Sequence, residues 1–331
     1  MKTLITGGAG YIGSTIASAC LDAGIVPVIL DDLSTGREEF TEGRAFYRGD
    51  IADGDVLDTV FRDHPDISAV IHCAAKIVVP ESVRDPLGYY ANNVSGTIAL
   101  VQHLLRHGCE RFLFSSSASI YQPGPDLSVD ESSPVDPQSP YAATKMMVER
   151  VLADAASALP LRVISLRYFN PVGADPLLRT GLQSPAPTHA LGKLIEAYES
   201  GTPFTITGTD WPTRDGSGIR DYIHVWDLAE AHVRALERFD EVVPAPRGYE
   251  VINLGTGRGT TVRELASAFQ DAVGDRLQVR EAGPRPGDAV GCFTRSDKAA
   301  AMLGWSATRT EKDGALDSLA WARKRPTILG R

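Results

Sequence analysis

The sequence predicts an α/β fold in which a doubly wound parallel sheet carries helices on both faces. Short apolar runs of strand length alternate with helical patterns from residue 3 to residue 166, an alternation typical of parallel sheets. A glycine-rich turn follows the first run, where such folds bind nucleotides. The 331 residues are enough for two domains. We expect a first domain over 1–174 and a smaller α/β domain over 175–331, with stretches near 222–257 that return to the first domain or bridge to it.

Composition narrows the class of protein further. Hydrophobic residues make up 43% of the chain and charged residues 23%, and the net charge is −9. A net negative charge disfavours general binding of nucleic acid or of anionic membranes. The first apolar residues run into glycines, so we expect neither a signal peptide nor a membrane span. The four cysteines are widely spaced, which favours reduced thiols and a cytoplasmic protein.

The first strand, helix and second strand have the pattern of a dinucleotide-binding unit. Three evenly spaced glycines follow the predicted strand 3–6: Gly7, Gly10 and Gly13. A helix to about residue 23 and a strand over 26–30 come next, and Asp31 ends that strand. Glycines let the backbone approach a pyrophosphate, the helix N-terminus stabilises its charge, and an acid here can accept hydrogen bonds from ribose hydroxyls. The sequence therefore predicts a Rossmann-type dinucleotide site.

The residues after Asp31 favour NAD over NADP. Asp32 adds a second carboxylate, and the nearest arginine, Arg37, lies several residues further on. A 2′-phosphate beside two carboxylates would be repelled. We therefore expect NAD as the cofactor.

Later strands deliver small or polar residues to the same edge of the sheet. We expect these strands over 45–48, 69–72, 111–114 and 161–166. The residues that follow them are candidates for the ligand site, because open α/β sheets bind ligands at the carboxyl ends of their strands. They are Asp50, Ile51, Cys73, Ala74, Ala75, Ser115, Ser116 and Ser117. His72, at one strand end, has the pattern of a hydrogen-bonded core histidine rather than of a catalyst.

Tyr141 and Lys145 form a candidate proton-transfer pair. They lie four positions apart at the start of a predicted helix over 141–156, so both side chains share one helix face. A nearby ammonium favours the ionised form of a tyrosine. Another long helix is predicted over 87–106, and a proline-rich loop separates residues 121 and 140.

These motifs together resemble the extended short-chain dehydrogenase/reductase superfamily and, within it, the UDP-glucose 4-epimerase family. The resemblance spans nearly the whole chain. Its motifs are Thr6-Gly7-Gly8-Ala9-Gly10-Tyr11-Ile12-Gly13, Phe114 to Ala118, Pro137 to Lys145, Leu166 to Gly173 and Gly218 to Val225. The Tyr-Phe-Asn-Pro-Val-Gly and Arg-Asp-Tyr-Ile-His-Val stretches are the more specific to nucleotide-sugar epimerases.

The resemblance implies a reversible 4-epimerisation through a 4-keto sugar, with tightly bound NAD. Tyr141 is the implied base at the sugar 4-hydroxyl, Lys145 lowers its pKa and holds the nicotinamide ribose, and Ser117 hydrogen-bonds the 4-oxygen. The other implied cofactor contacts are Gly7, Gly10, Tyr11, Ile12, Gly13, Asp31, Asp50, Ile51, Cys73, Ala74, Ala75, Lys76, Asn93, Ser115 and Tyr168.

The same matching implies a UDP-sugar site. The implied contacts are Ser117, Tyr141, Asn170, His189, Arg220, Arg285, Asp288 and Cys292. Arginine suits the diphosphate, and aspartate suits ribose hydroxyls. No metal is implied.

Three positions depart from the family pattern. Thr207 stands where an aromatic residue often stacks on uracil, and Thr188-His189 stands where Asn-Asn is frequent at the diphosphate. Cys292 is small where bulk limits the room at the sugar 2-position. Activity on UDP-N-acetylglucosamine is therefore expected beside activity on UDP-glucose.

Other reactions of this scaffold fit less well. Dehydratases place an Asp-Glu pair where Ala118-Ser119 follows Ser117, and a net reductase needs exchangeable NADPH. A 4-epimerase of a UDP-uronic acid stays an alternative, and a non-catalytic NAD-sensing regulator is a second one from a different class. The resemblance also implies a homodimer formed through helices 87–106 and 141–156.

Overall fold

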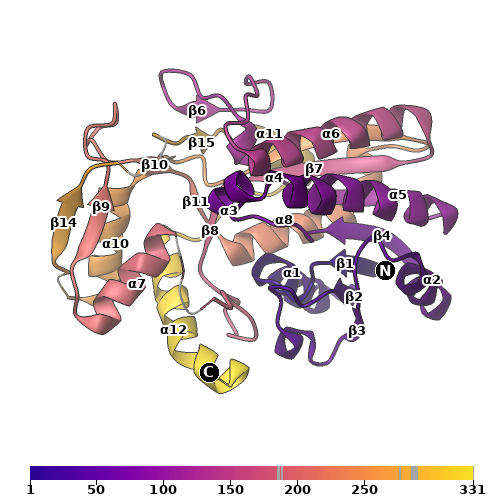
Figure 1. Ribbon diagram of the computed structural model, residues 1–331, viewed down its shortest axis with the longest axis horizontal. Coiled ribbons are helices and arrows are strands. Elements are labelled where there is room, and N and C mark those ends of the chain that lie inside the picture. The colour runs from indigo at the N-terminus through magenta and orange to yellow at the C-terminus, as the bar shows by residue number, and fades with distance from the viewer. Residues whose placement is uncertain (185–186, 188, 276, 285–289, 331) are drawn as a thin grey trace.

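A parallel sheet of seven strands forms the centre of the computed structural model, which describes residues 1–184, 187, 189–275, 277–284 and 290–330 (Figure 1). The strand order is β12-β7-β5-β4-β1-β2-β3, and every neighbouring pair is parallel. The strands are β1 (Lys2–Thr6), β2 (Val26–Asp31), β3 (Ala45–Arg48), β4 (Ile67–His72), β5 (Arg111–Ser117), β7 (Arg162–Tyr168) and β12 (Gly248–Leu254). This sheet, called the main sheet below, confirms the predicted fold class.

Alternate residues of the strands point to opposite faces of the main sheet, and both faces are apolar. Leu4, Val70 and Phe112 belong to one core, whereas their neighbours Ile5 and Ile71 belong to the other. Burial on both faces is what a parallel sheet covered by helices requires.

Two layers of helices cover these faces, as Figure 1 shows. The first layer, with Ile5 and Ile71 beneath it, contains α1 (Tyr11–Asp22), α8 (Val225–Glu237) and α11 (Asp297–Leu303). The second contains α2 (Gly54–Asp63), α5 (Gly96–Arg106) and α6 (Pro140–Ala158). The order of the strands reverses between β1 and β4, so the carboxyl ends of these two strands lie at the switch point, where such folds bind ligands.

The helix predicted over 87–106 is confirmed as one continuous helical run, but its middle is not a regular α-helix. It consists of α4 (Pro86–Tyr89), a π-helical segment η2 (Tyr90–Ser95) and α5, after the short α3 (Val79–Arg84). A π turn admits an extra residue. It carries Asn93, which is 3% exposed.

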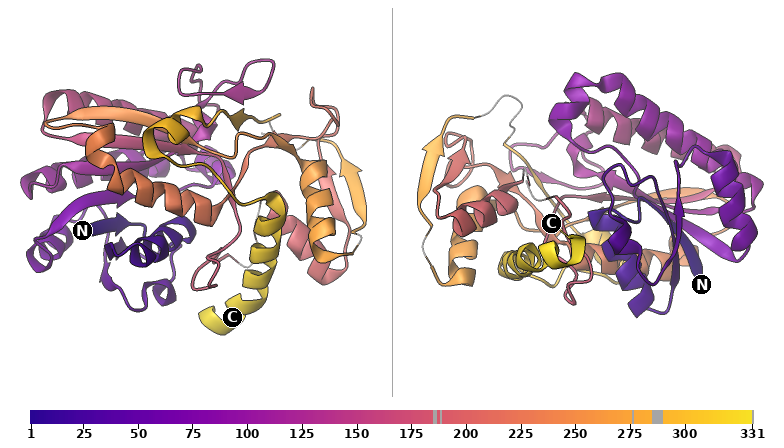
Figure 2. Two further views of the ribbon diagram at one scale, coloured as in Figure 1. Left: turned by 180° about the vertical axis from the view of Figure 1, so that it is seen from behind. Right: turned by 60° about the horizontal axis from the view of Figure 1, so that its bottom comes forward.

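The rest of the chain forms a group of helices and short strands beside the main sheet (Figure 2). Its apolar cluster unites α7 (Ala190–Ser200), α10 (Val262–Val273), α12 (Glu311–Leu329) and β9 (Phe204–Thr207). β9 pairs with β14 (Val279–Ala282). Since α8 and β12 lie beyond residue 174 yet belong to the main sheet and its helices, the chain crosses between the two parts more than once.

Short strand pairs connect these two parts near the carboxyl edge of the main sheet. β8 (Asn170–Val172) pairs with β11 (Tyr222–His224), β10 (Ile219–Arg220) with β13 (Thr260–Thr261), and β6 (Ser128–Val129) with β15 (Phe293–Thr294). The remaining short elements are η1 (Glu38–Thr41), η3 (Ala118–Ile120) and α9 (Phe239–Val242). Among the described residues, no helix combines the length and the apolar character needed to cross a membrane.

Candidate active site

The turn between β1 and α1 approaches the neighbouring backbone too closely for any residue but glycine. Gly7 has a φ of +71°, and a Cβ there would lie 2.6 Å from the amide nitrogen of Ala74. A Cβ on Gly13 would lie 2.3 Å from the carbonyl oxygen of Gly7. In the described chain no side chain caps α1 at Gly10, so its first amides face the turn. This cradle of bare backbone fits the pyrophosphate of a dinucleotide.

Asp31 lies at the end of β2, beside this turn. Its carboxylate accepts hydrogen bonds from the amides of Ala9 and Leu33, both at 2.9 Å. Burial raises the pKa of the Asp31 carboxyl, against the lowering effect of these two amides. A Cβ on Gly36 would lie 2.7 Å from Oδ1 of Asp31, so the following loop closes tightly over the acid. A fixed carboxylate here fits the ribose hydroxyls of NAD, and that contact stays a prediction.

The next strand, β3, brings Asp50 to the same edge. Asp50 is exposed and its carboxylate accepts from the amide of Ala52 at 2.7 Å, whereas Ile51 is buried. The amide of Gly49 donates to the carbonyl of Asp31 at 3.1 Å. The two predicted acids are therefore held on adjacent strand ends.

Asn93 organises the segment after β4. Its side chain accepts from the amide of Lys76 at 2.9 Å and donates to the carbonyl of Lys76 and to Oγ1 of Thr144, both at 3.0 Å. These bonds fix the segment that begins with Cys73, Ala74 and Ala75 against the helix that carries Tyr141. Asn93 thus holds the segment after β4, at the predicted cofactor site, through its bonds to Lys76 and Thr144. The ammonium of Lys76 lies 3.8 Å from the carboxylate of Asp85.

Tyr141, Lys145 and Ser117 lie where β5 meets the start of α6. Ser139 caps α6 by accepting from the amide of Ala142 at 3.2 Å, which begins the helix just before Tyr141. Burial raises the pKa of Tyr141 above its ordinary value, and a hydrogen bond with Ser117 offsets part of that increase. Ser117 also bonds the Oγ of Ser119 at 2.9 Å.

Lys145 is 4% exposed, and its ammonium donates to the carbonyl of Ser115 at 2.7 Å. Burial lowers the pKa of Lys145 to about 8. The Lys145 ammonium is therefore anchored to β5, and its effect on the pKa of Tyr141 stays a prediction.

Ser115 connects Lys145 to two further predicted residues. Its hydroxyl lies 3.1 Å from the Sγ of Cys73, and burial raises the pKa of that thiol to about 11. Tyr168, at the end of β7, has its pKa raised by burial, and a hydrogen bond with Ser115 lowers it. Both groups are thus neutral near pH 7.

Tyr11 and His189 line one cavity of about 340 Å³ between α7, α12 and the start of α1. The Tyr11 hydroxyl donates to the carbonyl of Gly173 at 2.7 Å. His189 begins α7, and its Nδ1 accepts from the amide of Gly192 at 3.2 Å. Burial lowers the pKa of His189 to about 4, so this histidine is neutral near pH 7 and supplies no positive charge for a diphosphate.

Asn170, Arg220 and Cys292 lie along the strands that bridge the two parts. Asn170 faces Tyr222 across the β8–β11 pair. The Arg220 guanidinium donates to the carbonyls of Ile219 and Val290 at 2.6 and 2.8 Å. Cys292 packs on an apolar cluster. The cluster contains Ala118, the residue after Ser117, and Phe169, the residue before Asn170. Two predicted substrate contacts, Arg285 and Asp288, lie outside the described residues, as does Thr188.

Sequence reasoning missed a buried ion pair behind Lys145. Arg167 and Glu149 are 8% and 6% exposed, and Nε of Arg167 donates to Oε1 of Glu149 at 2.9 Å. A signal was present, because Glu149 follows Lys145 by four residues and shares its helix face. His72 is a hydrogen-bonded core residue, as predicted: its two ring nitrogens bond Thr6 at 2.7 Å and Thr97 at 2.8 Å.

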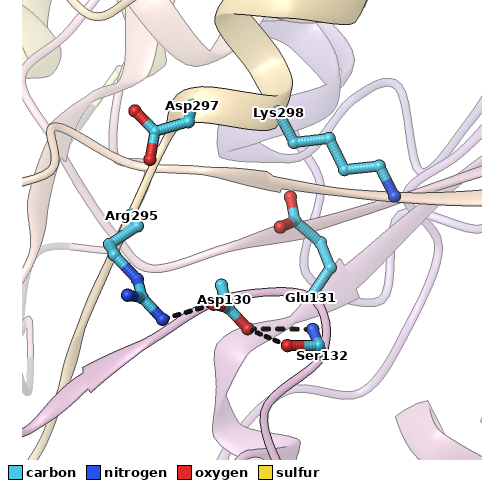
Figure 3. Close-up of a pocket in the computed structure, with 6 residues that line it drawn as sticks. All are labelled: Asp130, Glu131, Ser132, Arg295, Asp297 and Lys298. Atoms are coloured by element: carbon cyan, nitrogen blue, oxygen red, sulfur yellow. Dashed lines mark hydrogen bonds and ion pairs between the residues drawn. The ribbon is translucent and has the colours of Figure 1, made fainter.

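A second, open depression of about 540 Å³ lies away from these residues, next to β15 and α11 (Figure 3). Charged groups line it, and several pair with one another or with nearby residues: Asp130 with Arg295, and Lys298 with Glu250 at 2.6 Å. Glu131 accepts from the amide of Asn253 at 2.7 Å. Asp130 and Glu131 thereby tie the loop between β5 and α6 to Arg295 and to β12.

Comparison with known proteins gives consistent results over the full chain. The profile of the NAD dependent epimerase/dehydratase family matches residues 3–255. A UDP-glucose 4-epimerase of Azospirillum brasilense is 41% identical over 333 residues, which cover 100% of this chain and 94% of that protein.

Two solved structures are similar throughout. The UDP-glucose-4-epimerase of Stenotrophomonas maltophila, with bound NAD and formylated UDP-arabinopyranose, has a TM-score of 0.92 and 35% identity and covers 99% of both chains. The UDP-glucose 4-epimerase of Bifidobacterium longum, in complex with NAD+ and UDP, has a TM-score of 0.89 and 33% identity, covering 99% of this chain and 100% of that one.

Proposed function

This chain belongs to the NAD dependent epimerase/dehydratase family, and from that premise we propose that it is a UDP-glucose 4-epimerase. It interconverts UDP-glucose and UDP-galactose with NAD as its cofactor. The observation that carries the proposal is the meeting of the glycine cradle, Asp31 and the Tyr141–Lys145 helix at one edge of the main sheet. The full-length likeness to epimerases supports the same reaction.

Tyr141 is the proposed base and acid of the reaction. It takes the proton from the sugar 4-hydroxyl as the C4–H bond breaks, and it returns that proton after the 4-keto sugar has turned over in the site. The chemistry that NAD supplies when bound is reversible acceptance of the C4 hydride. Because burial raises the pKa of Tyr141, a positive charge from Lys145 is needed to favour tyrosinate near neutral pH. Ser117 hydrogen-bonds the same 4-oxygen.

The remaining predicted residues hold the two nucleotides. We assign the cofactor pyrophosphate to the glycine cradle and its adenosine ribose to Asp31. The UDP diphosphate is assigned to Asn170 and Arg220, with Arg285 and Asp288 as further contacts. The cofactor part of the chain is 1–174 together with α8 and β12, and most of the remainder of 175–331 holds the substrate.

We also propose that the protein is a cytoplasmic homodimer joined through α4, α5 and α6. Several large apolar side chains are exposed on this helical surface, and they support the proposal. They are Leu87 on α4, Ile98 on α5 and Met147 on α6, which are 79%, 36% and 41% exposed. Exposed apolar residues gathered on neighbouring helices are typical of an interface.

The test is to incubate the purified protein with UDP-galactose, without added NAD, and to measure the UDP-glucose formed. Turnover is expected because NAD is regenerated in each cycle and stays bound. Tyr141→Phe removes the proposed base and should lower kcat by about 10²–10⁴-fold, with the NAD content of the protein unchanged. A Tyr141→Phe protein with full activity would exclude Tyr141 as the base, and a wild type without turnover would exclude the reaction.

A further inference from the structure

Three polar residues form a row across the strands next to the candidate site. Ser116 on β5 lies beside Arg167 on β7, and Arg167 lies beside Asn253 on β12. The next row along the same strands contains Ser117 and Tyr168. Because neighbouring residues of a strand are covalently joined, whatever fixes the first row also fixes the second.

Glu149 on α6 joins this row from the helix above it. Its two carboxylate oxygens accept from Nε and Nη2 of Arg167 at 2.9 and 2.5 Å, and the hydroxyl of Ser116 donates to Oε1. The third guanidinium nitrogen donates to the hydroxyl of Tyr121 at 2.8 Å, and that hydroxyl donates to Asn253 at 2.7 Å. The carboxylate and the guanidinium thus form a buried bidentate pair, and each guanidinium nitrogen donates a hydrogen bond.

The pair connects to the proposed reacting groups by short covalent paths. Glu149 lies one helical turn after Lys145, which lies one turn after Tyr141. Ser116 lies between Ser115, whose carbonyl holds the Lys145 ammonium, and Ser117. Stability alone does not require such a pair, since well-packed apolar residues often replace a buried ion pair without loss of stability.

We propose that Glu149 and Arg167 are positioning residues, which lock α6 to β5 and β7 so that Tyr141 and Lys145 stay opposite Ser117. This inference rests on the proposed epimerase function. Neither side chain is assigned a contact with the sugar or with the nicotinamide. Their role is exerted through the helix and the strand that they join.

The pair also sets the charge around Lys145. Besides Tyr141, whose pKa Lys145 is proposed to lower, the ionisable groups that act on the Lys145 ammonium or feel its charge are Glu149, the thiol of Cys73 and the imidazole of His72. Burial keeps the last two neutral near pH 7. Glu149 is therefore the only charged one of the three, and Arg167 stands behind it as the balancing charge.

The two single variants should consequently have opposite effects. Glu149→Gln leaves the Arg167 charge unbalanced, so Lys145 should lose its proton at lower pH. In the plot of kcat against pH, the alkaline limb should therefore move to lower pH by about half a pH unit or more. Arg167→Met leaves the Glu149 charge unbalanced and should move that limb up. NMR titration of the Lys145 ε-carbon, identified by its loss in Lys145→Met protein, measures the same shifts without turnover.

The charge-free double variant, Glu149→Gln with Arg167→Met, separates positioning from stability. We expect it to unfold at nearly the wild-type temperature and to keep its NAD, but to have kcat about 10-fold lower with KM for UDP-galactose nearly unchanged. Wild-type kcat in a folded double variant would overturn the proposal, as would single variants whose alkaline limbs and Lys145 titrations move in the same direction or not at all.

If a single variant does not fold, the double variant decides by the same kcat and KM values. If the wild type does not epimerise UDP-galactose, the proposed function fails. The Lys145 titrations of the folded variants then still test whether the pair sets the charge at that residue.

Discussion

At the scale of single residues, burial rather than sequence spacing sets the ionisation of the candidate site. The spacing of Tyr141 and Lys145 predicts an ammonium near the phenol, but the ammonium donates to the carbonyl of Ser115. Burial raises the pKa of Tyr141 and lowers that of Lys145 to about 8. Each shift disfavours the charged form, so the proposed base needs the charge of its cofactor as well as that of Lys145.

His72 gives a prediction on pH and stability. The hydroxyl of Thr97 donates to the carbonyl of Asn93 at 2.6 Å, so His72 donates from Nε2 and accepts from Thr6 at Nδ1. Burial lowers the pKa of His72 from 6.5 to about 3. The unfolded chain therefore binds one more proton than the folded chain between these values. The stabilisation is complete above pH 6.5 and is lost as the pH falls toward 3.

The measurement is urea unfolding between pH 6.5 and 5 of wild type and His72→Gln. The free energy of unfolding of the wild type should fall more steeply, by up to about 1.4 kcal/mol per pH unit once below pH 6.5. Gln keeps one donor and one acceptor but does not titrate. Equal slopes in the two proteins would show that His72 is protonated in the folded state.

Cys292 gives a prediction on specificity. Its small side chain packs next to Ala118 and Phe169, and we propose that it leaves room at the sugar 2-position. Wild type should epimerise both UDP-glucose and UDP-N-acetylglucosamine. Cys292→Phe should lower kcat/KM for the acetylated sugar by about 10-fold or more while changing that for UDP-glucose less. No turnover of the acetylated sugar by the wild type would contradict the expectation, and Cys292→Ser serves as the size-matched control.

At the scale of elements, the β1–α1 turn depends on close backbone approach. Gly7→Ala adds a Cβ at a φ of +71° that would lie 2.6 Å from the amide nitrogen of Ala74. The left-handed backbone costs about 1–2 kcal/mol for a residue with a Cβ, and the steric contact adds to it. We expect lower stability together with loss of NAD from the purified protein, measured by thermal unfolding and by the absorbance of extracted NAD.

Gly24→Ala is the matched control for this turn. Gly24 has a φ of +73°, but apart from its own chain neighbours no atom of the described residues lies within 4 Å of the position of its Cβ. Gly24→Ala should therefore lose a similar amount of stability to the left-handed backbone, but the variant should keep its NAD. Equal loss of NAD from both variants would mean that stability, and not the shape of the cradle, controls cofactor retention.

The segment Tyr90–Ser95 shows a second way in which an element serves the site. Its π-helical turn carries Asn93, whose side chain bonds the backbone of Lys76 and the side chain of Thr144. The side-chain amide of Asn93 thus joins the segment after β4, at the predicted cofactor site, to the helix that carries Tyr141. Residue pattern alone predicts only a helix here, because the extra residue of a π turn leaves no mark in local propensity.

At the scale of the whole molecule, the order of strands brings the site together. β1, β4, β5 and β7 are adjacent in the main sheet, although they end far apart in the chain, at residues 6, 72, 117 and 168. Their carboxyl ends therefore present the glycine cradle, Cys73, Ser117 and Tyr168 along one edge. The chain then crosses to the second part and returns with α8 and β12.

The proposed homodimer is tested at this scale. Leu87 is 79% exposed and Met147 is 41% exposed, and both lie on the proposed dimer surface. Leu87→Glu with Met147→Glu should shift the protein from dimer to monomer in sedimentation velocity, because charges in an apolar interface must be desolvated. Leu177→Glu is the control, since Leu177 is 65% exposed outside these helices. A monomeric wild type would contradict the dimer.

The fold class and most of the candidate groups can be predicted from consecutive residues of the chain. Strand length, the glycine spacing, Asp31 and the Tyr141–Lys145 motif all depend on local backbone requirements, which are written in consecutive residues. Tertiary structure alone decided which of these groups carry charge and what holds them. The Glu149–Arg167 pair, the neutral His189 and the bonds of Asn93 depend on burial and on partners from distant segments. Local patterns cannot encode such contacts, because each one is made only when the strands and helices have packed together.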